Sequence, residues 1–587
     1  MSAVFADRPG KERGIVMIRI SQIKMPVSHS EEDLLQKAAE LLHIEKTDIL
    51  SWKIVRKSVD ARKKPDIYFI YTVDVEAAGE ERILRRLSRD SHKGAGNRGP
   101  QIQKAEENAY HFPKAVRSLD AGRPVIIGTG PAGLFCGYLL AQYGYRPILL
   151  ERGKAVEDRK KDVESFWETG VLQPDSNVQF GEGGAGTFSD GKLNTLVKDR
   201  NGRNREVLRI FVRAGAPEEI LYEAKPHIGT DLLMLIVRNM REEILAWGGE
   251  VRFGNKVTDI LIDSGAIQGV VINGTERLGT DTVVLAIGHS ARDTFQMLYE
   301  RAVPMEAKAF AVGLRVEHPR RMIDRMQYGM EENPFLQAAD YKMTARTESG
   351  RGVYSFCMCP GGYVVNASSE EGRLAVNGMS YSGRAGKNSN SAVIVTVTPE
   401  DFESSHPLSG VAFQRMLEEK AYQIGHGRIP VERYGDFKKA VTGKEPEPSR
   451  ILQEYPDFAP EQKGGYRSRS AGTDAVPFLQ AITGHCLLSP VHLILPTPLN
   501  LAFVEGMEQF GRKLPGFQDS GVYVSGVESR TSSPVRIHRD EAGQSAVKGL
   551  YPCGEGAGYA GGITSAAMDG IYIAEKIAAP DFSLHGL

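Results

Sequence analysis

Short apolar segments and one helical stripe alternate at the start of the chain. Residues 15–22 (IVMIRISQ), 49–55 (ILSWKIV) and 66–75 (DIYFIYTVDV) are typical of strands. Between the first two, the sequence SEED at 30–33 predicts a capping box, and leucine and alanine then recur at helical spacing. The pattern predicts a small βαββ domain over residues 14–80.

Basic residues follow this domain and also interrupt it. The run 56–64 (RKSVDARKK) is expected to link the last two strands, and residues 82–104 are basic and glycine-rich after their first turn. We expect a basic linker over 81–119. A solvated linker or a contact between domains explains the positive charge most simply, and a nucleic-acid contact is the alternative.

Farther along, strand and helix patterns alternate from 122 to about 295. The pattern becomes mixed between about 296 and 515, and strands, a glycine-rich turn and a helix close the chain. Residues 124–145 carry no charge and have about the length of a membrane span. However, GTGPAG interrupts this run, and a second apolar run ends at Glu151, so the pattern predicts strand, turn, helix and strand.

Bulk composition excludes several protein classes. The chain has 587 residues, a formal net charge of −1, 41% hydrophobic and 25% charged residues, and five cysteines. A length of this size predicts several domains, and the near-zero charge gives no global attraction to nucleic acid or anionic membrane. Few cysteines and a start without an apolar core segment favour a reducing, cytoplasmic location over secretion.

The sequence RPVIIGTGPAGLFCGYLLAQYGYRPILLERG (123–153) contains a dinucleotide-binding fingerprint. Gly128 permits a tight turn, Gly130 lets the backbone approach a pyrophosphate, and Gly133 lets the helix pack closely on the strand. The N–H groups at the start of the helix favour phosphate. Glu151 ends the second strand, where an acidic residue accepts hydrogen bonds from ribose hydroxyls.

Residues 122–587 resemble the glutathione-reductase-like flavoprotein superfamily. The resemblance rests on the fingerprint and on four further segments, at 151–162, 177–195, 280–291 (TDTVVLAIGHSA) and 549–570 (GLYPCGEGAGYAGGITSAAMDG). It implies an α/β fold in which an FAD-binding Rossmann-like domain (120–295 and 516–587) is interrupted by a mixed α/β substrate or cap domain (296–515).

The same resemblance implies where FAD is held. Glu555 would bind the ribityl chain, although the family more often has Asp there, and the helix start at Gly562 and Ile563 would face the pyrimidine end of the flavin. The other implied cofactor contacts are Pro131, Ala132, Arg152, Arg159, Gly183, Gly184, Thr187, Lys192, Val257, Gly288 and Gly554.

A single GxGxxG motif places the chain in the single-Rossmann branch, with geranylgeranyl reductases and hydroxylases. Along its whole length it resembles a bacterial family of uncharacterised FAD-dependent dehydrogenases, which shares FCMCPGG and GEGAGYAGGI. The resemblance implies an FAD-dependent oxidoreductase that transfers a hydride to or from a small-molecule substrate, with NADH or NADPH as a transient reductant. Two alternatives stay open: a flavoprotein that modifies RNA, and a non-catalytic FAD-binding protein.

Candidate substrate residues lie in two polar segments. Arg530 and Arg536 in 527–540 could hold an anionic substrate or nicotinamide phosphates, or could belong to a salt-bridged loop. Arg384, Lys387, Asn388 and Asn390 in 383–393 could contact a cofactor or lie on a surface loop. The sequence predicts no metal site, because it has no HExxH motif, and because His485 and His492, seven residues apart, are more typical of ordinary histidines than of ligands.

The sequence SFCMCPGG (355–362) brings Cys357 and Cys359 close together. In a regular strand both thiols would point to one face and Met358 to the other. Their Cα atoms would be about 6.6 Å apart, close to the limit of about 6.8 Å for a disulfide. Three interpretations follow: structural side chains, a thiol lining the flavin site as a weak catalytic candidate, or a strained redox pair.

Overall fold

The computed structural model describes most of the chain. The described residues are 17–90, 99–106, 109–114, 118, 122–402, 404–458, 482–483 and 485–579, with only the backbone described at 87–90, 457 and 482–483. The chain forms two compact units, one of residues 1–109 with 221–226 and one of residues 110–220 with 227–587. The first residues of the chain and parts of the expected basic linker and substrate domain lie outside the described residues.

The first unit is an antiparallel sheet with strand order β2-β3-β1-β4. Its strands are β1 (Ile18–Pro26), β2 (Ile49–Lys63), β3 (Asp66–Ala77) and β4 (Gln101–Lys104), and its helices are α1 (Glu31–Leu42) and α2 (Glu80–Asp90). The predicted capping box is confirmed, because Ser30 and Asp33 exchange hydrogen bonds at the start of α1. Ile20, Val73 and Leu34 are buried together with the other apolar residues of this face.

Two expectations for the first unit were wrong. The run 56–64 is not a link, because β2 continues to Lys63 and pairs with β3 as far as Asp66. Moreover, helix α2 and strand β4 lie within the range expected to be a linker, and β4 pairs with β1. The charged residues suggested connecting segments instead of strands. Strands β2 and β4 lie at the edges of the sheet, where side chains need not be buried, so charged residues are compatible with them.

A short segment that lies between elements of the second unit in sequence belongs to the first unit. Residues 221–226 run beside β2, where Lys57 N–H donates to the Tyr222 carbonyl and Ala224 N–H donates to the Lys57 carbonyl. The Lys57 ammonium also lies 2.9 Å from the Glu223 carboxylate. This segment therefore adds hydrogen bonds to the edge strand of the sheet.

A five-stranded parallel sheet forms one half of the second unit. Its strand order is β24-β11-β5-β6-β7, with β5 (Val125–Ile127), β6 (Ile148–Leu150), β7 (Glu250–Arg252), β11 (Val283–Leu285) and β24 (Leu550–Pro552). The apolar segment 124–145 thus forms strand, turn and helix as expected, with α3 at Pro131–Gln142. The expected α/β class, with a Rossmann-like sheet interrupted by a second sheet, is confirmed.

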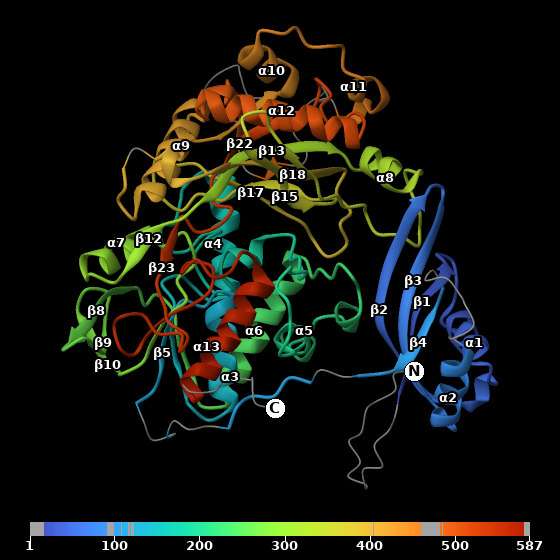
Figure 1. The fold of residues 1–587 in the computed structure, drawn as a ribbon. Coiled ribbons are helices and arrows are strands. Elements are labelled where there is room, and N and C mark those ends of the chain that lie inside the picture. Colours follow the sequence, from blue (N-terminus) through green and yellow to red (C-terminus); the bar gives the residue numbers. More distant parts are fainter. Residues whose placement is uncertain are drawn as a thin grey trace. The chain divides into compact units, whose positions relative to one another are not determined.

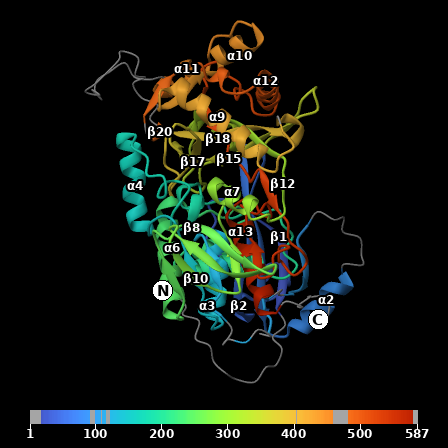
Figure 2. The same ribbon diagram turned by 90° about the vertical axis from the view of Figure 1, so that its left-hand side faces the viewer.

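Different elements cover the two faces of this sheet (Figure 1 and Figure 2). Ile126, Leu149 and Val284 face helices α3, α5 (Arg203–Arg213), α6 (Thr230–Ala246) and α13 (Ile563–Ala578). Their neighbours along the strands, such as Val125 and Leu285, face the antiparallel sheet β8–β10 and helix α7 (Arg292–Glu300). The strands β8, β9 and β10 span Val257–Asp263, Ala266–Ile272 and Glu276–Gly279. Helix α4 spans Val156–Thr169.

A seven-stranded sheet, in the order β14-β15-β18-β13-β22-β19-β21, forms the other half. The strands span Thr344–Arg346 (β14), Gly352–Cys359 (β15), Asn388–Val397 (β18), Phe310–Pro319 (β13), Tyr523–Glu528 (β22), Ile429–Arg433 (β19) and Cys486–Leu488 (β21). The helices of this half are α8 (Arg320–Tyr328), α9 (Ser409–Gly425), α10 (Tyr434–Thr442), α11 (Ile451–Glu454) and α12 (Thr497–Lys513). Two small sheets complete it: β17 (Val376–Met379), β16 (Tyr363–Asn366) and β20 (Ile482–Thr483), and β12 (Met305–Ala307) with β23 (Val535–Ile537).

The two faces of the seven-stranded sheet differ in polarity. Leu314 and Val316 of β13 point into an apolar core with α9, α10 and α12, which lie above the sheet in Figure 1. Arg315 and Glu317 alternate with them and are nevertheless fully buried on the opposite face. Strand β22 lies inside this sheet, so the part of the chain after 515 first completes the inserted half and only then returns to the parallel sheet.

Close packing of α3 gives a test of the Rossmann-like half. A Cβ atom on Gly133 would lie 2.0 Å from the Gly128 carbonyl oxygen, whereas nothing lies within 4 Å of a Cβ atom on exposed Gly383. Gly-to-Ala changes in helices usually stabilise, but we expect Gly133→Ala to lower the free energy of unfolding by about 3 kcal/mol or more. Gly383→Ala is the matched control and should be close to neutral. Urea denaturation followed by circular dichroism measures both, and equal stabilities would contradict the close approach.

Candidate functional site

The fingerprint turn joins β5 to α3. Gly128 has φ +99°, in the left-handed region, and a Cβ atom there would lie 2.5 Å from the Ala286 carbonyl oxygen. Gly130 is the N-cap of α3 and Pro131 is its first residue. The first N–H groups of a helix have no acceptor within the helix, so this turn presents donors and a partial positive charge.

A second glycine turn, formed by residues 181–184, lies against the first. Gly184 has φ +61°, and a Cβ atom there would lie 2.9 Å from the Gly130 Cα atom. Gly183 N–H donates to the Thr129 carbonyl. The two turns therefore meet through main-chain atoms, without intervening side chains.

Arg159 supports the second turn from below. Its guanidinium is fully buried and donates to the carbonyl oxygens of Asn177, Val178, Glu182 and Gly184. Burial lowers the pKa of Arg159 to about 10. The sequence predicted a cofactor contact here, and the structure shows that the side chain shapes the loop that borders the site.

The closing segment brings two more turns to the same place. A Cβ atom on Gly556 would lie 2.3 Å from the Gly288 carbonyl oxygen, and one on Gly554 would lie 2.6 Å from the Ala132 Cβ atom. Gly562 is the N-cap of α13, and the side chain of Ile563 lies against Gly186. The turns that the sequence predicted as cofactor-binding therefore converge, although they are up to about four hundred residues apart along the chain.

This convergence forms a cradle lined by main-chain atoms, with two helix N-termini directed at it. We define the cradle by the turns at 128–133, 181–186, 288–289 and 554–563. Space is open at two of its turns, because nothing lies within 4 Å of a Cβ atom at Gly288 or Gly562. Such a cradle suits a long, flat, anionic ligand that approaches the backbone closely.

Glu151 is buried beside the cradle and is saturated with hydrogen bonds. One carboxylate oxygen accepts from the N–H and the hydroxyl of Thr129, and the other accepts from the N–H groups of Gly153 and Gly181. A carboxylate accepts about four hydrogen bonds in total. Glu151 therefore ties the two glycine turns together, and a ribose hydroxyl would have to replace one of these donors.

Three other residues expected to bind the cofactor have partners in the protein. Arg152 forms a two-pronged ion pair with Asp293, and the Val257 side chain is packed in the core beneath the sheet. Burial alone would raise the pKa of Asp293, but Arg152 and Lys256 hold it far below its usual range. Thr187 is buried under Gly183.

Glu555 lies at the rim, where its carboxylate is 3.2 Å from Nδ1 of His289. His289 is buried, and within the described part of the chain its Nε2 atom has no hydrogen-bond partner. A buried polar atom without a partner is costly, so this nitrogen is suited to a ligand atom in the cradle. The sequence gave no separate indication of His289.

The loop that leaves the second glycine turn connects the cradle to the inserted half. Asp190 forms a buried ion pair with Arg384, and Ser380 donates a hydrogen bond to the same carboxylate. Lys192 donates to the carbonyl oxygen of Met358 and lies 3.9 Å from Asp190. Arg384 thus serves to hold the two halves together, and Lys192 lies next to the cysteine pair.

The strand geometry expected for the cysteine pair was wrong. A bulge interrupts the pairing of β15 with β18 between Phe356 and Cys359, and Cys357 has φ +41°. The Cys359 thiol is fully buried and donates to the Cys357 carbonyl at 3.2 Å. The regular alternation of faces assumed from the sequence does not apply, because the bulge changes the direction of the side chains.

Arg315 is the charged centre of the polar face behind the cysteines. It pairs with Glu528, donates to the Cys357 carbonyl at 2.8 Å and lies 4.0 Å from the Cys359 sulfur atom. Asn377 and Asn390 accept its remaining hydrogen bonds. Of the other polar residues of 383–393, Asn388 approaches buried Glu317, and the Lys387 carbonyl accepts from Arg320 N–H.

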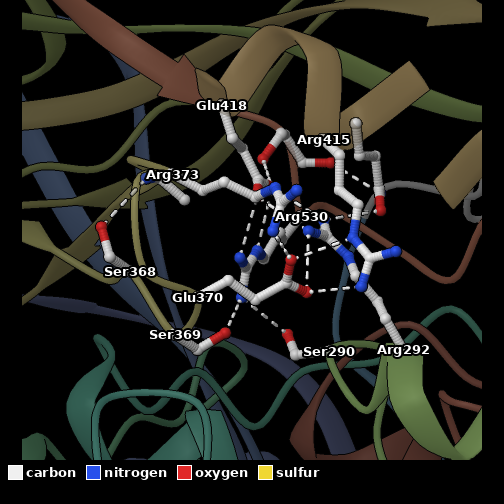
Figure 3. Close-up of polar contacts among 12 residues, drawn as sticks. Ser290, Arg292, Ser368, Ser369, Glu370, Arg373, Arg415, Glu418 and Arg530 are labelled. Carbon is white, nitrogen blue, oxygen red and sulfur yellow. Dashed lines mark hydrogen bonds and ion pairs between the residues drawn. The ribbon is translucent and has the colours of Figure 1, made fainter. Parts of the chain in front are cut away.

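Arg530 belongs to a second buried network, drawn in Figure 3. Its guanidinium forms a two-pronged pair with Glu418, which also pairs with Arg292, and it donates to Ser290 and Ser369. Burial alone would raise the pKa of Glu418, but Arg292 and Arg530 hold it well below its usual range. Of the two interpretations for Arg530, the geometry supports the salt-bridged one.

Arg536 has a different environment. It donates to the Gly558 carbonyl at 3.1 Å and stacks over the Tyr559 ring, at the rim of the cradle. Among the described residues, no carboxylate lies within 4 Å of its guanidinium. Arg536 is therefore the better candidate of the two for an anionic group.

Sequence reasoning missed the buried ion pairs Arg292–Glu418 and Arg315–Glu528. The partners are far apart in sequence, so no local pattern reveals them. One signal was present: FAVGLRVEHP (310–319) has two charged residues inside an otherwise apolar strand. Charges at such positions are rarely buried unless they are paired, and this could have suggested a partner.

The described part of the chain contains neither a metal-binding cluster nor a membrane-spanning helix. No group of three or more His, Cys, Asp or Glu residues there could hold a metal ion. None of the helices in the described ranges is both long enough and apolar enough to cross a bilayer.

Comparison with known proteins gives one full-length relative. A Clostridium beijerinckii protein described as uncharacterised is 43% identical over 571 residues, which cover 95% of this chain and 98% of that protein. Residues 309–463 match the family model of an FAD-dependent protein, C-terminal domain-like, and residues 17–76 match a domain of unknown function.

Two solved structures illustrate distant matches. Glycine oxidase from Bacillus cereus is 12% identical and covers 78% of this chain and 94% of its own, with a TM-score of 0.27. The structure of CtdE in complex with FAD is 11% identical and covers 78% of this chain and 83% of its own, with a TM-score of 0.29. Likeness at this level carries no argument about activity.

The network of Figure 3 predicts that the adjacent residues Glu418 and Glu419 contribute very differently to stability. Glu418→Gln leaves the buried Arg292 and Arg530 without their shared counter-charge, so we expect a loss of about 3–5 kcal/mol in the free energy of unfolding. Glu419→Gln removes only a partly exposed pair with Arg373 and should cost about 1 kcal/mol or less. Urea denaturation measures both, and equal losses would contradict the assigned roles.

Glu317 predicts a pH dependence of stability. Burial raises its pKa to about 7, against partial lowering by Asn388 and Arg315. The folded chain therefore holds a proton that the unfolded chain loses near pH 4.5, and stability falls as pH rises from there to about 7.

Glu317→Gln removes this loss, because the amide does not titrate. The quantity to compare is the free energy of unfolding of the variant minus that of wild type. We expect this difference to be higher at pH 8 than at pH 4.5 by an amount on the order of 1–3 kcal/mol. Denaturation curves at several pH values give the comparison. Parallel pH profiles for the two proteins would show that Glu317 is charged in the folded state.

Proposed function

The chain belongs to the family represented by the Clostridium beijerinckii protein, and on that premise we propose that it is an FAD-dependent oxidoreductase. In this proposal it transfers a hydride to or from a small-molecule substrate. The observation that supports it is the cradle, where four turns distant in sequence meet through main-chain atoms beside two helix N-termini. The match of residues 309–463 to an FAD-dependent protein family agrees with this choice of cofactor.

Different residues of the cradle would hold different parts of FAD. The turn at Gly128–Gly133 and the start of α3 would bind the pyrophosphate, with Gly183 and Gly184 on its other side. Glu151 would lie at the adenosine ribose. Glu555 and the start of α13 at Gly562 and Ile563 would lie toward the flavin ring.

Bound flavin would supply two-electron chemistry, and the protein would supply position and electrostatics. The N–H groups at the start of α13 would favour negative charge at the nearer edge of the ring. His289, with its unpartnered nitrogen, would donate to or accept from a ligand atom. The buried polar face around Arg315 would exclude bulk water from the inner side of the site.

NADH or NADPH is proposed as the reductant. With one fingerprint in the chain, a nicotinamide cofactor would visit the flavin without a Rossmann domain of its own. Arg536 at the rim could hold its phosphates or an anionic substrate, since no described carboxylate neutralises it. Anaerobic mixing with each nucleotide tests this, because bleaching of the flavin spectrum identifies the competent reductant.

The basic run at 56–64 in the first unit is a weaker argument for RNA modification than its sequence indicates, so small-molecule chemistry is favoured. Lys57 is paired with Glu223 and Arg62 with Asp60, so part of the positive charge is already neutralised. Paired cations release fewer counterions on binding nucleic acid. The run therefore offers a weaker electrostatic surface than its sequence indicates.

The substitution Gly130→Ala is expected to weaken cofactor binding without disturbing the fold. Gly130 has φ −69°, which alanine tolerates, and the nearest heavy atom to a Cβ atom there would be 3.8 Å away. The added methyl group would nevertheless occupy the place where a pyrophosphate approaches. We expect purified wild-type chain to carry equimolar FAD, and the variant to fold normally but retain at least about tenfold less.

Absorbance spectra and chromatography of the acid-released cofactor against FAD and FMN standards measure the content. Gly383→Ala is the control and should keep its FAD. A wild-type protein without flavin, or a Gly130→Ala variant with full FAD content, would contradict the proposed function or the assigned cradle, respectively.

A further inference from the structure

The five cysteines have very different surroundings. Cys136 and Cys553 are fully buried near α3 and β24, where burial raises their thiol pKa values, and burial also raises the pKa of half-buried Cys486 to about 11. Cys357 and Cys359 instead lie at the charged centre of the inserted sheet. All five are free thiols in the structure.

The backbone of the pair departs from a strand. Cys357 has φ +41°, in the left-handed region that L-residues rarely adopt. The bulge at this point turns the chain before Pro360 and Gly361, and Cys359 is pressed against Gly362, where a Cβ atom would lie 2.9 Å from its own Cβ. Strained backbone of this kind persists where the surroundings enforce it, and it is common at functional sites.

The two thiols are not equivalent. Cys357 is half-buried and Cys359 is completely buried. Interaction with the Cys359 side chain lowers the pKa of the Cys357 thiol, and Arg315 and Lys192 lower it further, against the effect of burial. Burial raises the pKa of Cys359. A half-buried cysteine with a lowered pKa beside a fully buried thiol is the arrangement of an attacking and a resolving cysteine.

The charged groups that act on the pair are two cations and two anions. Arg315 and Lys192 act on Cys357 against Glu528, and Asp190 acts on Cys359. Asp190 is itself paired with Arg384, and His227 beside Arg384 is neutral near pH 7, because burial lowers its pKa to about 4. A thiolate at Cys357 would be stabilised by Arg315 and Lys192.

The pair is also connected to the cradle through a short stretch of chain. Gly184 touches Gly130, Gly186 touches Ile563 at the start of α13, and Lys192 then donates to the Met358 carbonyl, between the two cysteines. Nine residues of one loop therefore span from the phosphate turn to the thiols.

From this geometry we propose that Cys357 and Cys359 form a dithiol–disulfide couple whose substrate class is a disulfide. The inference rests on the proposed function, which provides reduced flavin as the electron source. The Cys357 thiolate attacks one sulfur of the substrate disulfide, forms a mixed disulfide and releases one thiolate. Cys359 gives its proton to the first released thiolate and attacks Cys357 Sγ, which forms the internal disulfide and releases the second thiolate. Two electrons from reduced flavin and two protons restore the dithiol.

An electron count tests the couple. Air-oxidised holoprotein is titrated anaerobically with dithionite, and its flavin content is measured independently. We expect wild type to accept twice the electrons that its flavin alone accepts, and Cys357→Ser and Cys359→Ala to accept only the flavin share. Cys486→Ala is the matched control and should keep the wild-type count.

The outcomes separate the two proposals. A protein that contains flavin but accepts only the flavin share, also after treatment with a thiol oxidant, overturns the dithiol couple and leaves the proposed function intact. A protein without flavin overturns the proposed function. Because Cys357 is half-buried, Cys357→Ser should fold even if Cys359→Ala does not.

Alkylation gives a second measurement that does not depend on flavin. The reduced protein is treated with iodoacetamide across a pH series, and each cysteine is quantified by mass spectrometry. We expect Cys357 to react at lower pH than Cys486, and Cys359→Ala or Lys192→Gln to shift its profile to higher pH. Equal profiles for Cys357 and Cys486 would overturn the assignment of an attacking thiolate.

Discussion

Main-chain segments touch directly at Gly133 and Gly184, and these contacts determine how closely α3 and the two glycine turns of the second unit pack. Gly133 places α3 against the turn that precedes it, and Gly184 places a second turn against Gly130. A Cβ atom at either position would overlap the opposing main chain, so the two elements would have to move apart. Because α13 packs on α3 and the loop to Lys192 starts at Gly184, the positions of both the closing helix and the inserted sheet follow from these contacts.

Local signals in the sequence were sufficient for this part of the molecule. Gly128, Gly130, Gly133 and Glu151 are predictable because the fingerprint is a continuous stretch, and each glycine has a steric reason that holds in any chain. Glu151 shows the limit of such reasoning. Its position was predictable, but its four hydrogen bonds come from residues 129, 153 and 181, and only the folded chain shows that they saturate it.

The inserted half could not be predicted in the same way, since its polar interior is built from distant pairs. Arg315 meets Glu528 across two adjacent strands, and Glu418 meets Arg292 and Arg530 from three separate segments. Burial of such charges is tolerated only when each has its partner, so a local pattern of one strand cannot reveal them. The direction of the cysteine side chains was wrong for a related reason. A bulge is a change of register against the neighbouring strand, and the pattern of one strand alone did not reveal it.

The segment 221–226 has a consequence for how the chain could have been assembled. It adds hydrogen bonds to the edge of the first unit, although it lies more than a hundred residues after β4. The chain therefore passes between the two units three times rather than once. The first unit is thus not an independent module joined by a single tether. Any fusion, duplication or loss of this unit during evolution would have had to replace, or do without, a strand-edge partner encoded within the Rossmann-like half.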